Sequence, residues 1–262
     1  MKFIKLLKYI EKSYEDKPSF LILMSDNKEY ISNGCIFIEN KKEDGEYLIE
    51  VYNCQSYLEE LLNSSDCDMS NVTNASHMFC NSNITEFNGD MSSVTDASCM
   101  FYNTNLTKFN SDMSNVTDAR SMFTYTLLTE FNSDMSSVTD ARSMFAYSNL
   151  TKFNSDMSSV TNASYMFSDS NITEFSGDMS SVTNASSMFA YSNLTEFNSD
   201  MSNVTNAYTM FCNSNLTVFN SDMSSVTDAR WMFNGSNLTE FNSDMSSVTD
   251  ASSMFYHTPY NN

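Results

Sequence analysis

The chain has 262 residues, of which 41% are hydrophobic and 13% aromatic, and its formal net charge is −20 at pH 7. This composition is too apolar for a disordered chain, and the negative charge makes nucleic acid and anionic membrane surfaces poor partners. No run of 18 apolar residues occurs, so the sequence predicts no membrane span.

Residues 1–56 do not repeat, and we interpret them as a separate N-terminal domain. Lysines interrupt the apolar residues at the start and no small-residue cleavage site follows, so no signal peptide is predicted. We expect this domain to cap the first of the repeats that follow, with an independent binding or targeting module as the alternative. Its expected elements are an amphipathic helix in FIKLLKYIEKSYED (3–16), strands in SFLILM (19–24), CIFIE (35–39) and EYLIEVYN (46–53), and a hairpin turn in KKEDGE (41–46).

Charge divides the chain near residue 60. Eight of the 13 Lys and Arg residues precede residue 43, whereas from Asp66 onward five basic residues face 21 acidic ones. The segment SYLEELLNSS (56–65) resembles a degenerate first repeat. The second predicted domain therefore covers residues 57–262 and contains about nine repeats of 22 residues.

Methionines spaced by 22 residues, from Met69 to Met245, fix the period of this region. A constant period of this size indicates a solenoid or array. A helix is disfavoured, because 11 of the 22 residues 132–153 are Ser, Thr, Asn or Asp, which together cost about 5 kcal/mol relative to Ala. We instead predict short strands and turns, with each unit wrapping once around a shared apolar interior. Seven residues per unit would form that interior, in one unit Leu106, Phe109, Met113, Val116, Ala119, Met122 and Phe123.

The segment DMSSVTDARSMFAYSNL (134–150) resembles the bacterial-surface-protein repeat, whose usual wording is DxSNVTxMSxMFxxCxxL. This DUF285-type family is related to the leucine-rich repeats of BspA-like proteins, and the resemblance covers residues 62–257. Ala97 and its equivalents stand where the family usually has Met or Ile, and Ser82 or Ser148 stands where Cys is common. The resemblance implies a leucine-rich-repeat-like curved solenoid with a small α+β cap, used for surface binding. It implies no enzyme and no catalytic residues.

Polar residues also recur in files, which are columns of residues spaced by 22. One file of aspartates runs from Asp68 to Asp244. Carboxylates of neighbouring units would repel one another, and this repulsion is offset either by hydrogen bonds from turn amides or by cations such as calcium. Threonine files at 73–249 and 85–239 suggest ice binding, although they lie 10 or 12 positions apart within a unit and are expected on different faces. An asparagine file, broken at Leu127, is expected to form a ladder of amide hydrogen bonds.

The sequence offers no constellation for catalysis. His77 and His257 lie at opposite ends of the repeats, and His77 falls one period before Cys99. Two ligands are too few for zinc, and no third group completes a Cys–His nucleophile. The six cysteines show no CxxC spacing, which is typical of free thiols in a reducing compartment. We predict no catalytic residue, no metal ligand and no cofactor.

Each unit contains a Met-Phe pair, as at Met122 and Phe123. The positions around this pair vary from unit to unit, whereas the apolar positions do not. If the variable positions share a face, that face carries Tyr, Trp and Arg, the residue types enriched in interface hot spots. Neutral variation of a solvated face is the alternative. The binding residues predicted on this basis are Tyr102, Arg120, Tyr125, Arg142, Tyr147, Tyr165, Tyr191, Tyr208, Arg230 and Trp231.

The sequence thus predicts a non-enzymatic scaffold for recognition or adhesion whose partner is a protein or a glycan. The alternatives are an ice- or calcium-binding surface and a carbohydrate-active solenoid enzyme. Few residues follow Phe255 to cover the last unit, so an end-to-end homodimer through this unit is expected. The lack of a signal peptide makes a cytoplasmic location the default, whereas the resemblance implies a cell-surface or secreted protein.

Overall fold

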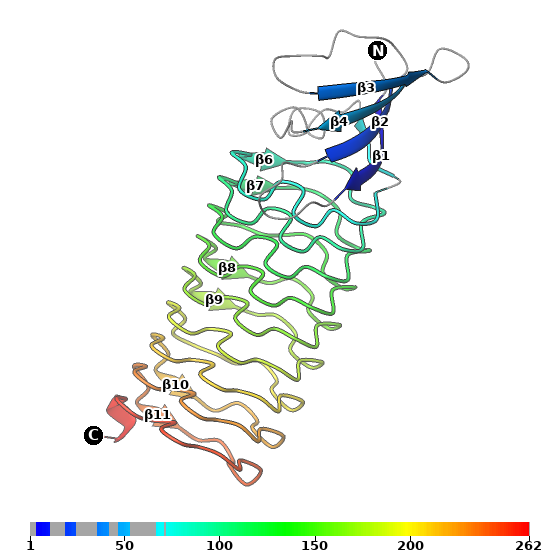
Figure 1. Cartoon of the computed structure of the whole chain (residues 1–262). Coiled ribbons are helices and arrows are strands. Elements are labelled where there is room, and N and C mark those ends of the chain that lie inside the picture. Colours follow the sequence, from blue (N-terminus) through cyan, green and yellow to red (C-terminus); the bar gives the residue numbers. More distant parts are fainter. Residues whose placement is uncertain are drawn as a thin grey trace.

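The structure is a computed structural model that describes residues 4–10, 19–24, 36–41, 47–52, 67–70 and 72–261. The first described segments are the strands β1 (Ile4–Ile10), β2 (Ser19–Met24), β3 (Ile36–Lys41) and β4 (Tyr47–Tyr52). They form a sheet in the order β3-β4-β2-β1-β5, in which the short β5 (Cys67–Asp68) is the only parallel neighbour. Through β5 the sheet connects directly to the start of the repeats (Figure 1).

The helix predicted over residues 3–16 is wrong where the structure describes it, because Ile4–Ile10 is strand β1. β1 pairs antiparallel with β2, and a register shift between Leu6 and Lys8 accommodates one additional residue. Pairing with β2 therefore overrides the local helical pattern of the apolar residues. The three predicted strands coincide with β2, β3 and β4, and the predicted hairpin agrees with the β3–β4 pairing. The rest of the predicted helix, the turn at 42–46 and the lead-in at 56–65 lie outside the described residues.

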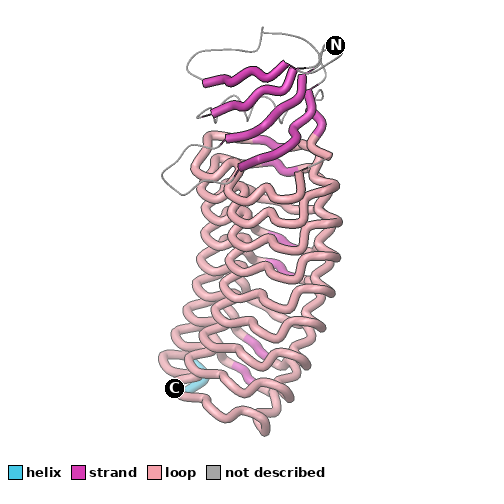
Figure 2. Tube along the Cα trace, turned by 45° about the vertical axis from the view of Figure 1, so that its right-hand side comes forward, coloured by secondary structure: helices cyan, strands magenta, loops and turns pink. Residues whose placement is uncertain are grey.

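From residue 72 onward the chain is mainly β and turn, with little helix, and successive 22-residue units lie one above the other (Figure 2). Isolated parallel bridges join Asn74 to Asp96 and continue at the same spacing to Asp250. The sheets beyond the first are small, each a parallel pair of two-residue strands. These pairs are β6 (Glu86–Phe87) with β7 (Lys108–Phe109), β8 (Lys152–Phe153) with β9 (Glu174–Phe175), and β10 (Val218–Phe219) with β11 (Glu240–Phe241).

The units share one apolar interior, as the sequence predicts. All seven predicted core residues of the unit 106–123 are buried, and so are their equivalents in the units on either side. In the file that begins at Phe79, consecutive ring centroids are 5.4–5.9 Å apart with the rings nearly parallel. A second file begins at Phe87, and its rings meet those of the first file edge to face. Each unit alone could not bury these rings, so neighbouring units stabilise one another.

Turns around the Met-Phe pair hold the units together on one face. Alternate N–H groups donate to the next unit, for example from Tyr125 to the carbonyl of Ala146, while the intervening N–H groups close short turns within the unit. Two positions in each unit have a positive φ of 51–68°. One position belongs to the file that contains His77, and the other to the file that contains Asn81. This left-handed geometry strains residues other than Gly and Asn by about 1–3 kcal/mol each. The two files nevertheless contain Tyr, Trp, Thr, Ser and Cys.

The last unit is partly covered by the short helix η2 (Pro259–Asn261). The Tyr260 ring lies 4.9 Å from that of Phe255 and 6.2 Å from that of Phe241, and its N–H donates to the carbonyl of Leu238. The end predicted to be bare thus has a small lid, although Phe241 and Phe255 remain only half-buried. Within the described residues, no helix has the length and hydropathy that a membrane span requires.

Candidate functional site

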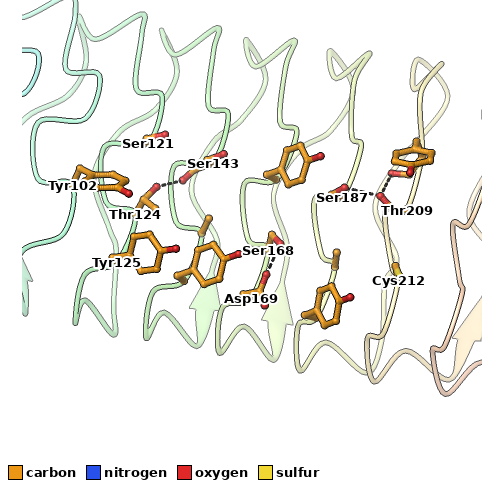
Figure 3. Close-up of a pocket in the computed structure, with 16 residues that line it drawn as sticks. Tyr102, Ser121, Thr124, Tyr125, Ser143, Ser168, Asp169, Ser187, Thr209 and Cys212 are labelled. Carbon is orange, nitrogen blue, oxygen red and sulfur yellow. Dashed lines mark hydrogen bonds between the residues drawn. The ribbon is translucent and has the colours of Figure 1, made fainter. Parts of the chain in front are cut away.

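The variable positions around the Met-Phe pair gather on one face and form a groove along the stack of units (Figure 3). We call this hollow of about 550 Å³ the tyrosine groove. Six of the ten predicted binding residues line it. Its lining consists of Tyr102, Ser121, Thr124, Tyr125, Ser143, Ala146, Tyr147, Tyr165, Ser168, Asp169, Ser187, Ala190, Tyr191, Tyr208, Thr209 and Cys212.

The floor of the tyrosine groove is one file of small residues, each directly after the Phe of the Met-Phe pair. From residue 124 to residue 212 the file reads Thr, Ala, Ser, Ala and Cys, and all five are buried. Tyr102 occupies the same file one unit earlier, and Asn234 and Tyr256 occupy it beyond Cys212. The groove is therefore open over five units and bordered by larger side chains at both ends.

The two left-handed files form the walls. Figure 3 shows Ser121 and Ser187 on one side of the floor and Tyr125 and Asp169 on the other. The exposed fractions of Tyr125, Tyr147 and Tyr191 are 44%, 48% and 58%, which is high for aromatic side chains. The strained turns thus hold large rings out of the core and beside the groove.

Aromatic contacts and hydroxyl groups dominate the surface of the groove. The rings of Tyr125 and Tyr147 are stacked with centroids 4.5 Å apart, and Tyr102 meets Tyr125 edge to face at 5.7 Å. Along the opposite wall, the hydroxyls of Ser187 and Thr209, from adjacent units, are 2.6 Å apart. These contacts hold side chains of each wall against one another.

Asp169 is the one carboxylate of the groove lining. The Ser168 hydroxyl donates to its Oδ2 at 2.9 Å. Its negative charge is also the main reason why the pKa of Tyr147 is raised above its usual value. No Lys or Arg lines the groove, so its surface is polar but nearly uncharged.

The predicted arginines lie outside the tyrosine groove. Arg120 and Arg142 line a neighbouring hollow that shares Ser121, Ser143 and Tyr165 with it. The guanidinium of Arg120 donates to Asp118 at 2.6–2.9 Å, and Arg142 pairs in the same way with Asp140. These hydrogen bonds hold the pKa of both arginines above the usual value. The arginines are therefore occupied within their own units.

Arg230 and Trp231 lie toward the C-terminal side of the groove. Arg230 pairs with Asp228 at 2.7 Å, and its guanidinium carbon lies 5.2 Å from the centroid of the Tyr208 ring. The Trp231 ring lies 6.2 Å from that of Tyr256. The structure thus brings together the six predicted tyrosines, keeps Arg120 and Arg142 beside them, and leaves Arg230 and Trp231 beyond the groove.

Sequence reasoning missed several residues of the groove and its partners. The small floor residues Ala146, Ser168 and Ala190 were not singled out, although their file changes from large to small side chains between residues 102 and 190. The aspartates that hold the arginines were missed as well. Their signal was an Asp two positions before each Arg of the repeats, as in Asp118 and Arg120.

The other polar files have structural partners. From Asp90 to Asp244, each described aspartate accepts the N–H of the residue two positions later, as Asp156 does from Ser158 at 2.8 Å. This bond is the main cause of the lowered pKa of Asp156. The side chains that the structure describes include no group of three or more His, Cys, Asp or Glu able to hold a metal ion. Turn amides therefore explain the aspartate file.

Threonine and asparagine files likewise bond between units. In the file from Thr95 to Thr249, each hydroxyl donates to the backbone carbonyl of the threonine one unit earlier, at 3.0–3.2 Å. Asparagine amides bond across units on both sides of Leu127, as Asn215 does to Asn193 at 3.2 Å. The predicted asparagine ladder is confirmed at these positions.

The three cysteines whose side chains the structure describes are poorly suited to nucleophilic chemistry. Cys80, Cys99 and Cys212 are free thiols. Burial raises the pKa of Cys80 to about 11, with a smaller contribution from Cys99, and burial also raises the pKa of Cys99 and Cys212. A thiol with a raised pKa carries little thiolate at neutral pH.

The model of one protein family matches most of the chain. That family is described as "Mycoplasma protein of unknown function, DUF285", and the matches cover residues 48–151, 131–217 and 155–262. The three matches overlap, as expected for a tandem repeat. No curated protein and no solved structure matches the chain.

Proposed function

Since the chain belongs to the family of Mycoplasma proteins of unknown function, DUF285, we propose that it is a non-enzymatic recognition scaffold that binds a protein or glycan through the tyrosine groove. The observation that carries the proposal is the groove itself, in which six tyrosines from different units surround a floor of small residues. Exposed aromatic rings beside a hollow are the side chains that contribute most to binding interfaces. A solvated face without a ligand has no need of large rings at strained positions.

The scaffold in this proposal is a solenoid related to the leucine-rich repeats. Two observations support it: hydrogen bonds link residues of adjacent units throughout residues 73–250, and like apolar residues stack in files. The N-terminal strands would then cap the first unit, and the parallel pairing of β1 with β5 supports that role. A capped repeat array provides a rigid surface on which exposed residues can vary without loss of the fold.

An end-to-end homodimer is a further part of the proposal. In preceding units the N–H groups equivalent to those of Ala251 and Ser253 donate to the next unit. Within the described residues these two donors make no such bond. A second copy could accept from them, as at other exposed strand edges. Sedimentation over a range of concentrations tests this, and a species that stays monomeric at every concentration contradicts it.

The binding role is tested by removing rings from the groove. Wild-type protein and the variant Tyr125→Ala/Tyr147→Ala/Tyr191→Ala would be applied to arrays of purified glycans and of extracellular proteins. The matched control is Tyr256→Ala, which removes an exposed tyrosine outside the groove. We expect a ligand that the wild type and the control retain and the triple variant loses. If every ligand retained by the wild type is equally retained by the triple variant, the groove is not the binding site.

A further inference from the structure

We propose that the tyrosine groove binds one extended chain of an uncharged glycan, which lies along the stack with about one sugar ring per repeat unit. This inference rests on the proposed function and names its ligand class. It follows from the charge of the groove, its spacing, its hydrogen-bonding groups and the shape of its floor.

Charge selects a neutral ligand. The groove lining holds one carboxylate, Asp169, and no basic residue, while the whole chain carries a net charge of −20. A polyanion such as an acidic glycan would be repelled, since the lining offers no cation to pair with it. A polycation would find a single carboxylate in the groove, and the Asp118 and Asp140 carboxylates near the adjoining hollow are already paired with arginines. Neither sign of charge is complementary to this surface.

Spacing disfavours an extended peptide. Consecutive units lie about one aromatic stacking distance apart, with ring centroids 5.4–5.7 Å apart in the core file next to the groove. Side chains on one face of an extended peptide repeat every 6.6–6.8 Å or so. Over four unit spacings the mismatch grows to about 4 Å. A sugar ring in an extended glycan has nearly the length of one unit spacing, so the two repeats stay in phase.

The backbone N–H groups along the groove are already used, so an added peptide strand would find no donors there. The N–H groups of Tyr125, Tyr147 and Tyr191 all donate to carbonyls of the following unit, at 2.8–3.1 Å. Peptide recognition by strand addition depends on free main-chain donors and acceptors. Recognition here must therefore use side chains.

The side chains of the groove suit sugar rings. Tyr125, Tyr147, Tyr165 and Tyr191 present large exposed surfaces, against which the C–H faces of a pyranose can pack. Their phenol groups and the Ser and Thr hydroxyls donate and accept hydrogen bonds, as sugar hydroxyls do. The Asp169 carboxylate can accept from two adjacent sugar hydroxyls. The small floor lets a ring approach the backbone between the walls.

The chain itself suggests a variant that blocks the groove without removing a tyrosine. Ala146 lies in the floor file, where two other units carry Tyr102 and Tyr256. Ala146→Tyr thus introduces a side chain that this file already accommodates, and it fills the middle of the groove. Cys80→Tyr is the matched control, because it adds the same side chain to the same file beyond Tyr102 and outside the groove.

The probes are neutral hexasaccharides of β-1,4-glucan, α-1,4-glucan, β-1,3-glucan, β-1,4-mannan and chitin, together with oligogalacturonate and an oligolysine peptide. Calorimetry or titration followed by NMR would be carried to about 10 mM ligand, where even weak binding is detectable. We expect at least one neutral hexasaccharide to bind, with affinity that rises from the disaccharide to about five sugars. Ala146→Tyr should weaken this binding about tenfold or more, and Cys80→Tyr should leave it unchanged.

The outcomes separate this inference from the proposed function. If the oligolysine peptide or oligogalacturonate binds in a way that Ala146→Tyr blocks, and no neutral sugar does, the groove is a binding site but the ligand class is wrong. The same conclusion follows if no neutral sugar binds while the arrays yield a protein ligand that depends on the groove tyrosines. If neither experiment yields a ligand sensitive to the groove variants, both proposals are refuted.

Discussion

Truncating one ring in the middle of the stack should destabilise the protein strongly. Phe167 is fully buried, and four phenylalanine rings lie around it with centroids 5.0–5.7 Å away. A buried aromatic ring removes about 150–250 Å² from water, which at about 25 cal/mol per Å² corresponds to roughly 4–6 kcal/mol. Since Ala keeps part of this contact, Phe167→Ala should lower the free energy of unfolding by about 3–5 kcal/mol.

The neighbours of Phe167 have little freedom to close the resulting cavity. The N–H of Phe145 donates to Met166 and that of Phe167 donates to Met188, each at 2.9 Å, so the backbone on both sides is fixed to adjacent units. The matched control is Phe255→Ala in the same file, where the ring is only half-buried under Tyr260. Because this ring is less completely buried than that of Phe167, its removal should cost less.

Urea unfolding followed by far-ultraviolet circular dichroism and by Trp231 fluorescence measures both variants. Linear extrapolation of each transition gives the free energy of unfolding. A loss below about 1 kcal/mol for Phe167→Ala, or equal losses for the two variants, would contradict a continuous ring file shared between units.

Three further predictions concern the turns and the titrating groups. Ser143 has a φ of 55°, which glycine adopts without strain and valine does not. In the same urea assay, Ser143→Gly should raise the free energy of unfolding by about 1 kcal/mol and Ser143→Val should lower it. Stabilisation by valine would disprove the left-handed turn. Burial raises the pKa of Cys80 to about 11, so at pH 8 this thiol should be alkylated about tenfold more slowly than an unperturbed thiol, because the smaller thiolate fraction outweighs the greater nucleophilicity of a more basic thiolate. Peptide mass mapping follows the rate, and a normal rate would mean that the thiol is accessible. Arg230 lowers the pKa of Asp228 in the folded protein. The pair therefore stabilises the fold at pH values above the pKa that Asp228 has in the unfolded chain. This stability is lost as the pH falls through the lower pKa of Asp228 in the folded protein. Asp228→Asn should therefore flatten the loss of stability below about pH 4, and an unchanged profile argues against the pair.

The apolar pattern predicted the core because it depends only on period and residue type. Met113 and Phe123 are buried as expected, since a 22-residue spacing places each above its equivalent in the next unit. The asparagine ladder followed from the same spacing. These features needed no knowledge of local backbone geometry.

Local backbone geometry explains what the sequence could not provide. Tyr147 and Trp231 occupy left-handed positions that their residue types do not favour, because hydrogen bonds to the next unit enforce them. The helix expected at residues 3–16 failed for a related reason: pairing of β1 with β2 is a long-range contact that a local pattern does not reveal.

The candidate site was predicted in part. The tyrosines were identified from their residue type at variable positions of the repeat, and the structure places six of them around one hollow. That they form walls rather than a flat patch depends on the buried Ala146 and Ala190 between them. Arg120 was expected to be available for binding, but a carboxylate two residues away pairs with it.

Deletion of one complete unit tests most directly the claim that each 22-residue unit makes one full circuit around the shared core. Removal of residues 154–175 joins Phe153 to Ser176, so every later residue stays in its file. We predict cooperative unfolding in urea and an unchanged shape of the circular dichroism spectrum. Removal of residues 154–164 shifts all later residues by half a circuit and should abolish cooperative unfolding. Equal behaviour of the two deletion variants would contradict the stacked-unit structure.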